Sequence, residues 1–138
     1  MTIQHFPPPQ GIKAPPLSFA TRTGDLLFIS GLMAIDRNGL VPAVAVDPRQ
    51  RHFSSPAEAQ AECIVGNIAK LCEAAGTSLA NVVRVLQFHT DIAEFYPVYK
   101  VWERRLGGRP LPFSAVEVPA PLPVPGATVM IEVWAYAP

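Results

Sequence analysis

Two glutamates near the C-terminal end of the chain stand among apolar residues. Glu117 lies in the run PFSAVEV and Glu132 in the run VMIEVWAY. A carboxylate in an apolar segment is costly unless it is paired, or is used to bind a ligand or to move a proton. The surrounding residues indicate two strands, 113–118 and 127–136, joined by a loop in which prolines alternate. Both glutamates are therefore candidates for chemistry or for a structural pair.

The histidines show no metal-binding or nucleophile pattern. His5, His52 and His89 are far apart and lack paired ligand spacing, so we expect no metal site. His89 falls in an expected strand, where a hydrogen-bonded core histidine is the commoner case. The sequence has no glycine-rich phosphate loop and no serine–histidine–acid pattern. We expect the protein to need no cofactor.

Composition restricts the partners. Lysine plus arginine and aspartate plus glutamate number 11 each, so the formal charge is zero. A nucleic-acid-binding protein needs a basic surface, so we expect no nucleic-acid partner. Hydrophobic residues make up 49% of the chain and charged residues 16%. Such an apolar small domain without net charge favours self-association.

The sequence predicts a cytoplasmic protein. MTIQHFPPPQ lacks the basic start and apolar run of a signal peptide. No apolar run reaches the roughly 18 residues that span a bilayer, so we expect no membrane partner. Cys63 and Cys72 fall in one expected helix, about 13 Å apart along its axis. That separation is too large for a disulfide, so we expect both thiols to be reduced.

The N-terminal third is expected to form strands. Residues 1–16 are rich in proline and predict an extended arm that docks or frays. Residues 18–23 lead to a turn at Gly24-Asp25. Residues 26–30 (LLFIS) are a continuous apolar run, typical of a strand buried on both faces.

A hairpin and a loop are expected next. Asn38-Gly39 is a strong hairpin-turn signal, which predicts that residues 33–36 pair with residues 40–44. Residues 46–54 are polar and predict a loop.

The first helix has clear start and stop signals. Ser55 suits the N-cap, Pro56 the first helical position, and Glu58 completes a capping box. Gly76 suits the left-handed stop. The expected buried stripe is Ala61, Ile64, Val65, Ile68, Cys72 and Ala75.

A strand and a second helix follow. Residues 81–90 are rich in β-branched side chains, which favours a central strand. Residues 95–106 predict a helix with Pro97 in its first turn and Gly107 at its end. Its expected inner stripe is Phe95, Val98, Trp102 and Leu106. The element order predicts one α+β domain over residues 1–138, a mixed β-sheet with two helices packed on one face.

Three segments resemble one known family. They are GDLLFISG at 24–31, EAAGTSLANVV at 73–83 and FSAVEV at 113–118. Together, and in this order, they are similar to the YjgF/RidA family of reactive intermediate deaminases. The resemblance implies a chorismate-mutase-like fold, a homotrimer, and small-molecule pockets between subunits. It also implies hydrolysis of enamines and imines without metal or cofactor.

The resemblance assigns roles to individual residues. Glu132 and Ser30 match pocket residues of the family, which implies Glu132 as the catalytic, water-positioning group and Ser30 as a ligand contact. Family members that deaminate carry an arginine in a Pro-x-Arg-Ser/Thr segment, and Phe113 stands in its place here. The other ligand-binding positions that differ from the family are Leu17, Phe19, Tyr99 and Ala115.

Loss of that arginine bears on the substrate. A 2-imino acid carries a carboxylate, and arginine binds a carboxylate with two parallel hydrogen bonds. Without it we expect weak activity on 2-iminopropanoate, unless Arg104, Arg105 or Arg109 reaches across a subunit boundary.

For Glu132 the alternative is a strand glutamate that is paired structurally or faces solvent, and for Ser30 a small residue needed at a tight strand end before Gly31. For the apolar pocket residues the alternative is plain core or interface packing; they are Phe113, Leu17, Phe19 and Tyr99. Glu117 is expected to be structural, with a hydrogen bond across subunits as one form of that role.

Three functions stay open at this point. The first is hydrolysis of a larger or less anionic enamine, imine or amide-like metabolite. The second is a ligand-binding or regulatory trimer without turnover. The third, ribonuclease activity, is attached to some family members, and the zero net charge disfavours it.

Overall fold

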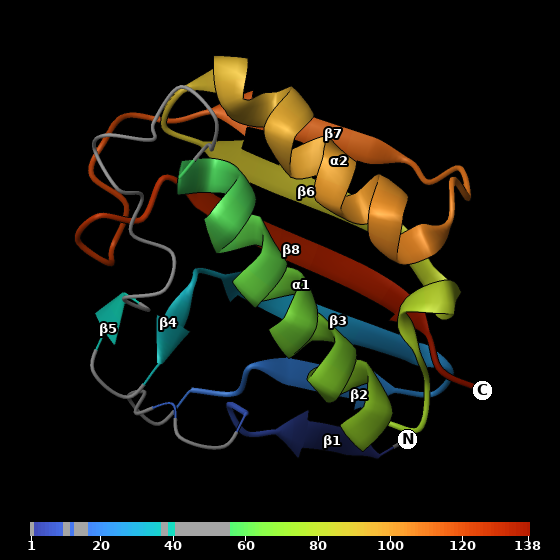
Figure 1. Cartoon of the computed structure of the whole chain (residues 1–138). Coiled ribbons are helices and arrows are strands. Elements are labelled where there is room, and N and C mark those ends of the chain that lie inside the picture. The colour runs from blue at the N-terminus through green and yellow to red at the C-terminus, as the bar shows by residue number, and fades with distance from the viewer. Residues whose placement is uncertain (1, 10–11, 13–16, 37–38, 41–55) are drawn as a thin grey trace.

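A single mixed sheet carries both long helices on one of its faces (Figure 1). The computed structural model describes residues 2–9, 12, 17–36, 39–40 and 56–138. The strand order is β1-β2-β3-β8-β6-β7. The bounds are β1 Ile3–Phe6, β2 Ala20–Thr23, β3 Leu26–Leu32, α1 Pro56–Ala74, β6 Val82–His89, α2 Phe95–Leu106, β7 Phe113–Glu117 and β8 Val129–Tyr136. The expected α+β class is confirmed.

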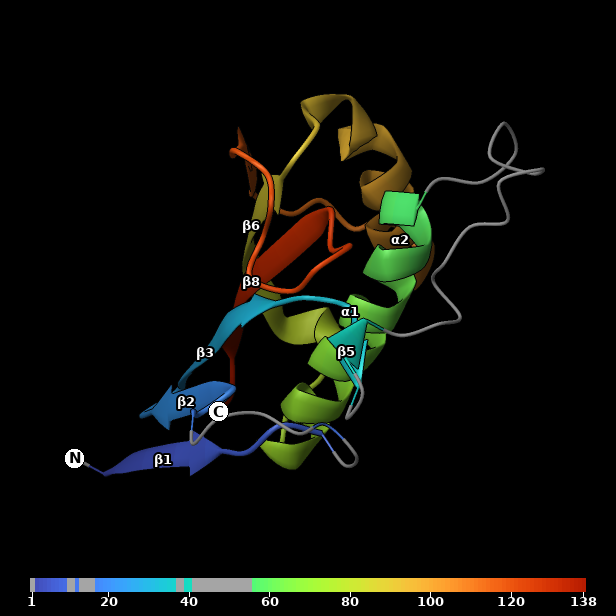
Figure 2. The same cartoon turned by 90° about the vertical axis from the view of Figure 1, so that its left-hand side faces the viewer.

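Among the described residues, no helix covers the second face of the sheet. Seen along the sheet, α1 and α2 lie on the same side of the strands (Figure 2). All pairings are antiparallel except that of β6 with β7, whose parallel register needs the α2 crossover. β8 lies between β3 and β6, in the middle of the sheet. We call the uncovered side the helix-free face.

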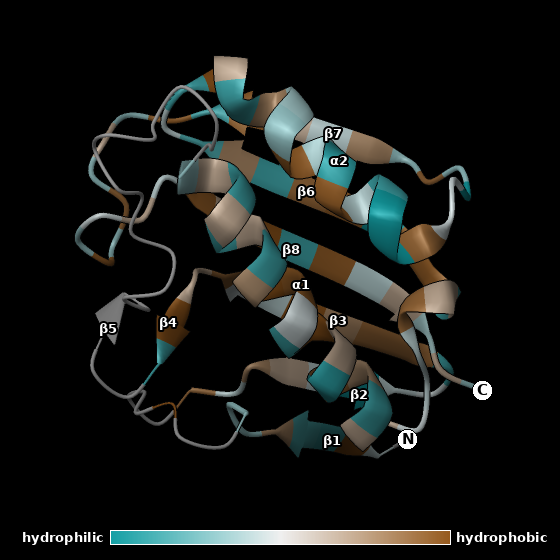
Figure 3. Ribbon diagram, viewed as in Figure 1, coloured by the Kyte–Doolittle hydropathy of each residue, from teal (hydrophilic) through white to brown (hydrophobic). Residues whose placement is uncertain are grey.

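Alternation along β8 decides which side chains reach each face. Ile131 and Val133 are fully buried under the helices, whereas Glu132 and Trp134 point to the helix-free face. Figure 3 shows hydrophobic positions recurring along β6 and β8 beneath the helices. β3 alternates in the same way, with Leu27 buried and Ser30 exposed. The expectation that residues 26–30 are buried on both faces is therefore wrong for the single chain, because helices cover one face only.

α1 has the predicted face. It begins at Pro56, and the predicted stripe residues are all buried. Each fully buried isoleucine contributes roughly 1.5–3 kcal/mol. Gly76 takes the left-handed conformation at φ 78°, and the Thr77 amide bonds the Cys72 carbonyl at 2.8 Å. The predicted N-cap, Ser55, lies outside the described residues.

α2 has the predicted bounds. Asp91 accepts a hydrogen bond from the Ala93 amide in the 3-10 turn Ile92–Glu94 that leads into the helix. Gly107 ends it at φ 59°. Val98 and Trp102 are buried as predicted, and Val101 joins them.

The N-terminal segment is a strand, so residues 3–6 are extended and docked, which is one of the two predicted alternatives; the other, a frayed end, is wrong for them. β1 pairs with β2 from Ile3↔Thr23 to Phe6↔Ala20. Phe6 is 6% exposed and joins the core. Backbone pairing together with one buried aromatic ring holds this strand.

The short hairpin is shifted by one residue from the prediction. β4 (Ile35–Asp36) pairs with β5 (Gly39–Leu40), and Asp36 lies opposite Gly39. Gly39 is therefore a strand residue and not part of the turn. The predicted partner residues 41–44 and the predicted loop 46–54 lie outside the described residues.

A buried glutamine holds the loop before β8. Gln60 of α1 is 2% exposed. Its amide donates to the Gly126 carbonyl at 3.1 Å, and its oxygen accepts from the Thr128 amide at 2.9 Å. Side-chain hydrogen bonds thus fix the entry to the central strand.

Glu117 is structural, as one of the two alternatives predicted. Its carboxylate accepts a hydrogen bond from the Ile92 amide at 3.0 Å. That bond joins the end of β7 to the turn before α2.

Candidate functional site

A hollow on the helix-free face brings together three of the predicted site residues. Its volume is about 330 Å³. Glu132, Ser30 and Phe19 line it. We call it the Glu132 hollow. Its remaining lining residues are Ser18, Ala20, Thr21, Phe28, Ile29 and Trp134.

Glu132 presents an unused carboxylate to this hollow. The strand alternation of β8 directs it away from the core, opposite Leu86 of β6. Within the described part of the chain its carboxylate has no hydrogen bond or ion pair. A half-buried carboxylate in this state can accept a proton from a bound water or a hydrogen bond from a ligand.

Ser30 reaches the hollow by the alternation of β3, just where the pairing of this strand becomes irregular. The register of β3 against β8 shifts between Ile29 and Leu32. Gly31 lies so close to Met130 that an added Cβ would be 2.8 Å from its sulfur. The Ser30 amide donates to the Phe19 carbonyl at 2.9 Å, which ties the serine to the start of β2. No hydrogen bond uses the Ser30 hydroxyl among residues that the structure describes.

An aromatic pair forms one wall of the Glu132 hollow. Phe28 and Trp134 meet edge to face, with ring centroids 5.3 Å apart. The guanidinium carbon of Arg84 lies 5.2 Å from the Trp134 ring centroid. Sequence reasoning missed this cation, although a single arginine within the apolar run of β6 was the available signal. Arg84 stacks on the far side of Trp134 and does not line the hollow.

A second hollow adjoins the first. It measures about 520 Å³ and is lined by His5, Phe6, Pro7, Leu17 and Ser18. We call it the His5 hollow. Ser18 lines both hollows. Leu17, predicted as a ligand contact, lines the His5 hollow and not the one that holds Glu132.

The remaining predicted site residues lie on the other side of the sheet. Phe113 faces α2, where its ring centroid is 5.5 Å from that of Tyr99 and 6.1 Å from that of Trp102. Ala115 shares this face, because it is two residues further along β7. Tyr99 is 37% exposed. One chain therefore separates the predicted residues into two groups on opposite faces.

Two of the arginines considered as replacements are already engaged. Arg104 bonds Glu62 at 2.6 Å and Glu58 at 3.1 Å, and Arg105 bonds Glu62 at 3.1 Å. These pairs join α2 to α1, on the helix-covered side. Arg109 is exposed in the turn after α2, where its amide bonds the Leu106 carbonyl.

His89 is a core residue, as predicted, although only one of its ring nitrogens is hydrogen-bonded. Its Nε2 lies 3.2 Å from Gln87 Oε1, and no described residue forms a hydrogen bond with its Nδ1. Burial lowers the pKa of His89 below its usual 6.5. No group of three or more metal-ligating side chains occurs among the described residues.

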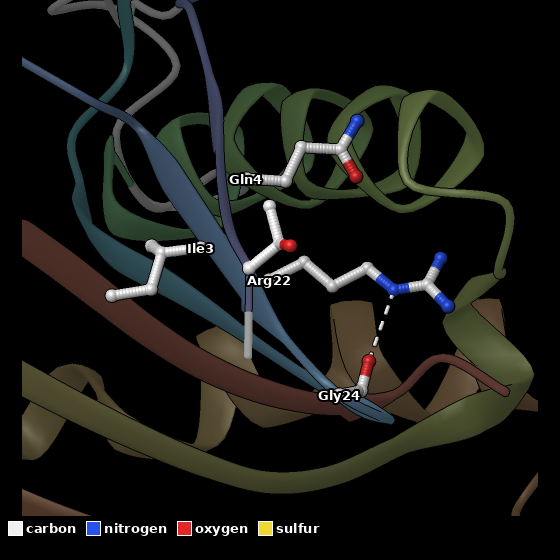
Figure 4. A pocket seen from close by; sticks show the side chains of 5 residues that line it. Ile3, Gln4, Arg22 and Gly24 are labelled. Carbon is white, nitrogen blue, oxygen red and sulfur yellow. Dashed lines mark hydrogen bonds between the residues drawn. The ribbon is translucent and has the colours of Figure 1, made fainter.

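Arg22 has a structural role in a third hollow, of about 290 Å³ (Figure 4). Its Nε donates to the Gly24 carbonyl at 3.1 Å, while its two terminal nitrogens donate to the Ala75 and Pro138 carbonyls. The guanidinium thereby joins the β2–β3 turn to the end of α1. We therefore do not treat it as a ligand-binding group.

Comparison with known proteins agrees with this fold. A family model described as Endoribonuclease L-PSP matches residues 11–137. The RutC family protein y4sK of Sinorhizobium fredii is 34% identical over 88 residues, which is 63% of this chain and 61% of that protein. This chain therefore matches less than two thirds of y4sK. Protein mmf2, mitochondrial, of Schizosaccharomyces pombe is 26% identical over 88% of this chain and 86% of its own length.

A solved structure gives the same result in three dimensions. The crystal structure of RidA from the Antarctic bacterium Psychrobacter sp. PAMC 21119 superposes with a TM-score of 0.71 at 30% identity. The match covers 93% of this chain and 99% of that one. Among the helices described, none is long and apolar enough to cross a membrane.

Proposed function

This chain belongs to the Endoribonuclease L-PSP family, also called YjgF/RidA, and on that premise we propose that it is a deaminase-type hydrolase. Its substrate is an enamine- or imine-type metabolite that is larger or less anionic than 2-iminopropanoate. The observation that carries the proposal is the unpartnered Glu132 carboxylate beside Ser30 in one hollow. The protein acts in the cytoplasm and needs no metal, cofactor or nucleic acid.

The proposed reaction needs one carboxylate and one water. Glu132 accepts a proton as the water oxygen bonds to the imine carbon, and the C=N electron pair moves to nitrogen, which takes up a proton. In the resulting carbinolamine the nitrogen takes the proton that Glu132 accepted, and the C–N bond breaks so that its electron pair leaves with ammonia. The hydroxyl proton passes to Glu132 as the C=O bond forms, and from there to solvent. A carbonyl compound remains. The Ser30 hydroxyl is available to hydrogen-bond the reacting group.

The substrate class follows from Phe113. A phenyl ring cannot bind a carboxylate, and Tyr99 and Trp102 surround it with further aromatic surface. Each hydrogen bond to a charged group contributes roughly 1.5–3 kcal/mol. A 2-imino acid therefore binds far more weakly here than in a site with the two-bond arginine contact, whereas a neutral imine loses no such contact.

The proposed assembly is a homotrimer with the sites between subunits. Glu132 and Ser30 lie on one face of the sheet, and Phe113, Tyr99 and Ala115 on the other, so a cleft built from both groups needs two copies. The helix-free face also exposes large apolar side chains, which a second copy would cover. They are Leu26, Val83, Val116, Trp134 and Tyr136. Sedimentation should give three times the monomer mass.

A second candidate is a ligand-binding or regulatory trimer without turnover. The aromatic group around Phe113 favours it, because apolar residues there can hold a ligand without assisting hydrolysis. Under this alternative the cleft binds a neutral metabolite and releases it unchanged.

Turnover of imines generated in the assay separates these functions. 2-Iminopropanoate is formed from L-alanine by an amino-acid oxidase, and neutral aldimines from primary amines by an amine oxidase. We expect hydrolysis of the aldimines well above the rate in buffer, and a loss of at least about 100-fold in Glu132→Gln. Glu73→Gln changes an exposed carboxylate at the end of α1 and is the matched control. Binding of an imine without turnover would support the regulatory trimer.

A further inference from the structure

The His5 hollow and the Glu132 hollow lie on the same face of the sheet. His5 pairs with Thr21 and Thr21 with Phe28, so all three side chains point to the helix-free face. Thr21 and Phe28 line the Glu132 hollow. Ser18 lines both hollows, so they border each other at this residue.

Hydrogen bonding at Ser18 determines which His5 nitrogen is free. The Ser18 hydroxyl donates to the Ala20 carbonyl at 2.7 Å, and its oxygen lies 3.3 Å from His5 Nδ1. A hydroxyl has a single proton, and its shortest contact takes it. His5 Nδ1 must therefore be the donor to Ser18. In the neutral imidazole this leaves Nε2 as a hydrogen-bond acceptor.

The walls of the His5 hollow are mainly apolar. Phe6, Pro7 and Leu17 form them, and Leu17 is 63% exposed. The volume of about 520 Å³ exceeds the 330 Å³ of the Glu132 hollow. Burying one methylene group strengthens binding by about fourfold. Partial burial of a chain of four methylene groups would then strengthen binding of the substrate by about tenfold.

From this arrangement we propose that the His5 hollow is the subsite for the side chain of the substrate. It takes an apolar substituent of about four or more carbon atoms, while the imine carbon occupies the Glu132 hollow. His5 Nε2 accepts a hydrogen bond from a hydroxyl or amine group on that substituent. The inference rests on the proposed function, because it names the substrate class of the same site.

Chain length is the first test. Aldimines are generated by an amine oxidase from ethylamine, hexylamine and 6-aminohexan-1-ol. For the unmodified protein, kcat/KM for the hexylamine product should exceed that for the ethylamine product by about tenfold. Leu17→Ala should remove most of this preference. Ile3→Ala, an exposed position on the same strand as His5, is the matched control and should change neither.

The hydroxyl-bearing substrate tests His5 separately. His5→Leu keeps an apolar wall but removes the acceptor. We expect the ratio of kcat/KM between the 6-aminohexan-1-ol product and the hexylamine product to fall about fivefold. An unchanged ratio would show that His5 does not contact the substituent.

A binding measurement distinguishes failure of the subsite from failure of the enzyme. Hexanamide and acetamide, which are not hydrolysed as imines, are titrated against Glu132→Gln with NMR detection of the Leu17 methyl groups. Tighter binding of hexanamide than of acetamide, with chemical-shift changes at Leu17, supports the subsite. If no imine is hydrolysed but this binding difference is found, only the hydrolysis proposal fails. Turnover that is independent of chain length, with equal binding of both amides, overturns the subsite and leaves the hydrolysis proposal intact.

Discussion

Replacing Phe113 with arginine should restore activity on 2-iminopropanoate. The substitution puts a guanidinium where the deaminating relatives are expected to carry one, at the first residue of β7. Tyr99 next to it is 37% exposed, so a long side chain can leave the aromatic cluster toward solvent. Arginine then offers two parallel N–H donors to the substrate carboxylate.

The structure sets the size of both effects. Each aromatic contact of Phe113, with Tyr99 at 5.5 Å and Trp102 at 6.1 Å, is worth about 0.5–1.5 kcal/mol. The free energy of unfolding should therefore fall by about 1–3 kcal/mol. Two hydrogen bonds to a carboxylate contribute about 3–6 kcal/mol, which corresponds to a gain of about 10²–10⁴-fold in kcat/KM.

The assay follows loss of 2-iminopropanoate, trapped by semicarbazide, at matched protein concentrations. Phe113→Met removes the same ring without adding charge and should show no gain. Phe113→Lys adds a single point charge, so its kcat/KM for 2-iminopropanoate should rise less than that of Phe113→Arg. Sedimentation and urea unfolding confirm that each variant is folded and assembled. Two results would refute the reasoning: a folded Phe113→Arg with no gain, or rapid hydrolysis of 2-iminopropanoate by the unmodified protein.

Three further predictions concern the core. Gln60→Ala leaves the Thr128 amide and the Gly126 carbonyl without their hydrogen-bond partner. The free energy of unfolding, measured in urea, should therefore fall by about 2–4 kcal/mol. A fall of less than about 0.5 kcal/mol would contradict this expectation. Burial lowers the pKa of His89, so the unfolded chain binds the proton more readily. The contribution of His89 to the free energy of unfolding should therefore be complete above pH 6.5. It should decrease as the pH drops toward the lowered pKa, by up to about 1.4 kcal/mol per pH unit. In His89→Gln the urea midpoint should lose this part of its pH dependence. Burial also raises the pKa of the Cys72 thiol to about 11, so mass spectrometry should find it unmodified by iodoacetamide at pH 8 until urea unfolds the chain.

The helices could be predicted from the sequence because their signals are local. Pro97 in a first turn and Gly107 at a left-handed stop are read from single residues, and α2 has the predicted bounds. β8 was predicted because residues 127–136 form an apolar run, and the strand begins two residues later, at Val129. β1 was missed, since its partner β2 lies beyond a proline-rich stretch and only tertiary pairing makes it a strand.

The candidate site was only partly predictable, because it depends on faces and not on residue types. Ser30, Phe19 and Glu132 were expected together, and one hollow holds them. Sequence position could not show that Phe113 faces α2 while Glu132 faces away from it. Nor could it show that Glu62 engages both Arg104 and Arg105, because helix-to-helix pairs depend on the packing of α1 against α2.

The position of β8 affects how the protein can be made. This strand follows the other described strands in the sequence, yet it pairs with both β3 and β6. While a ribosome is still translating residues before Val129, those two strands have no neighbour between them, and the sheet exists only as separate pieces. Folding must therefore wait until synthesis has passed the end of β8. A premature stop codon that removes β8 should yield an aggregating fragment, because it removes the middle of the sheet and exposes two strand edges.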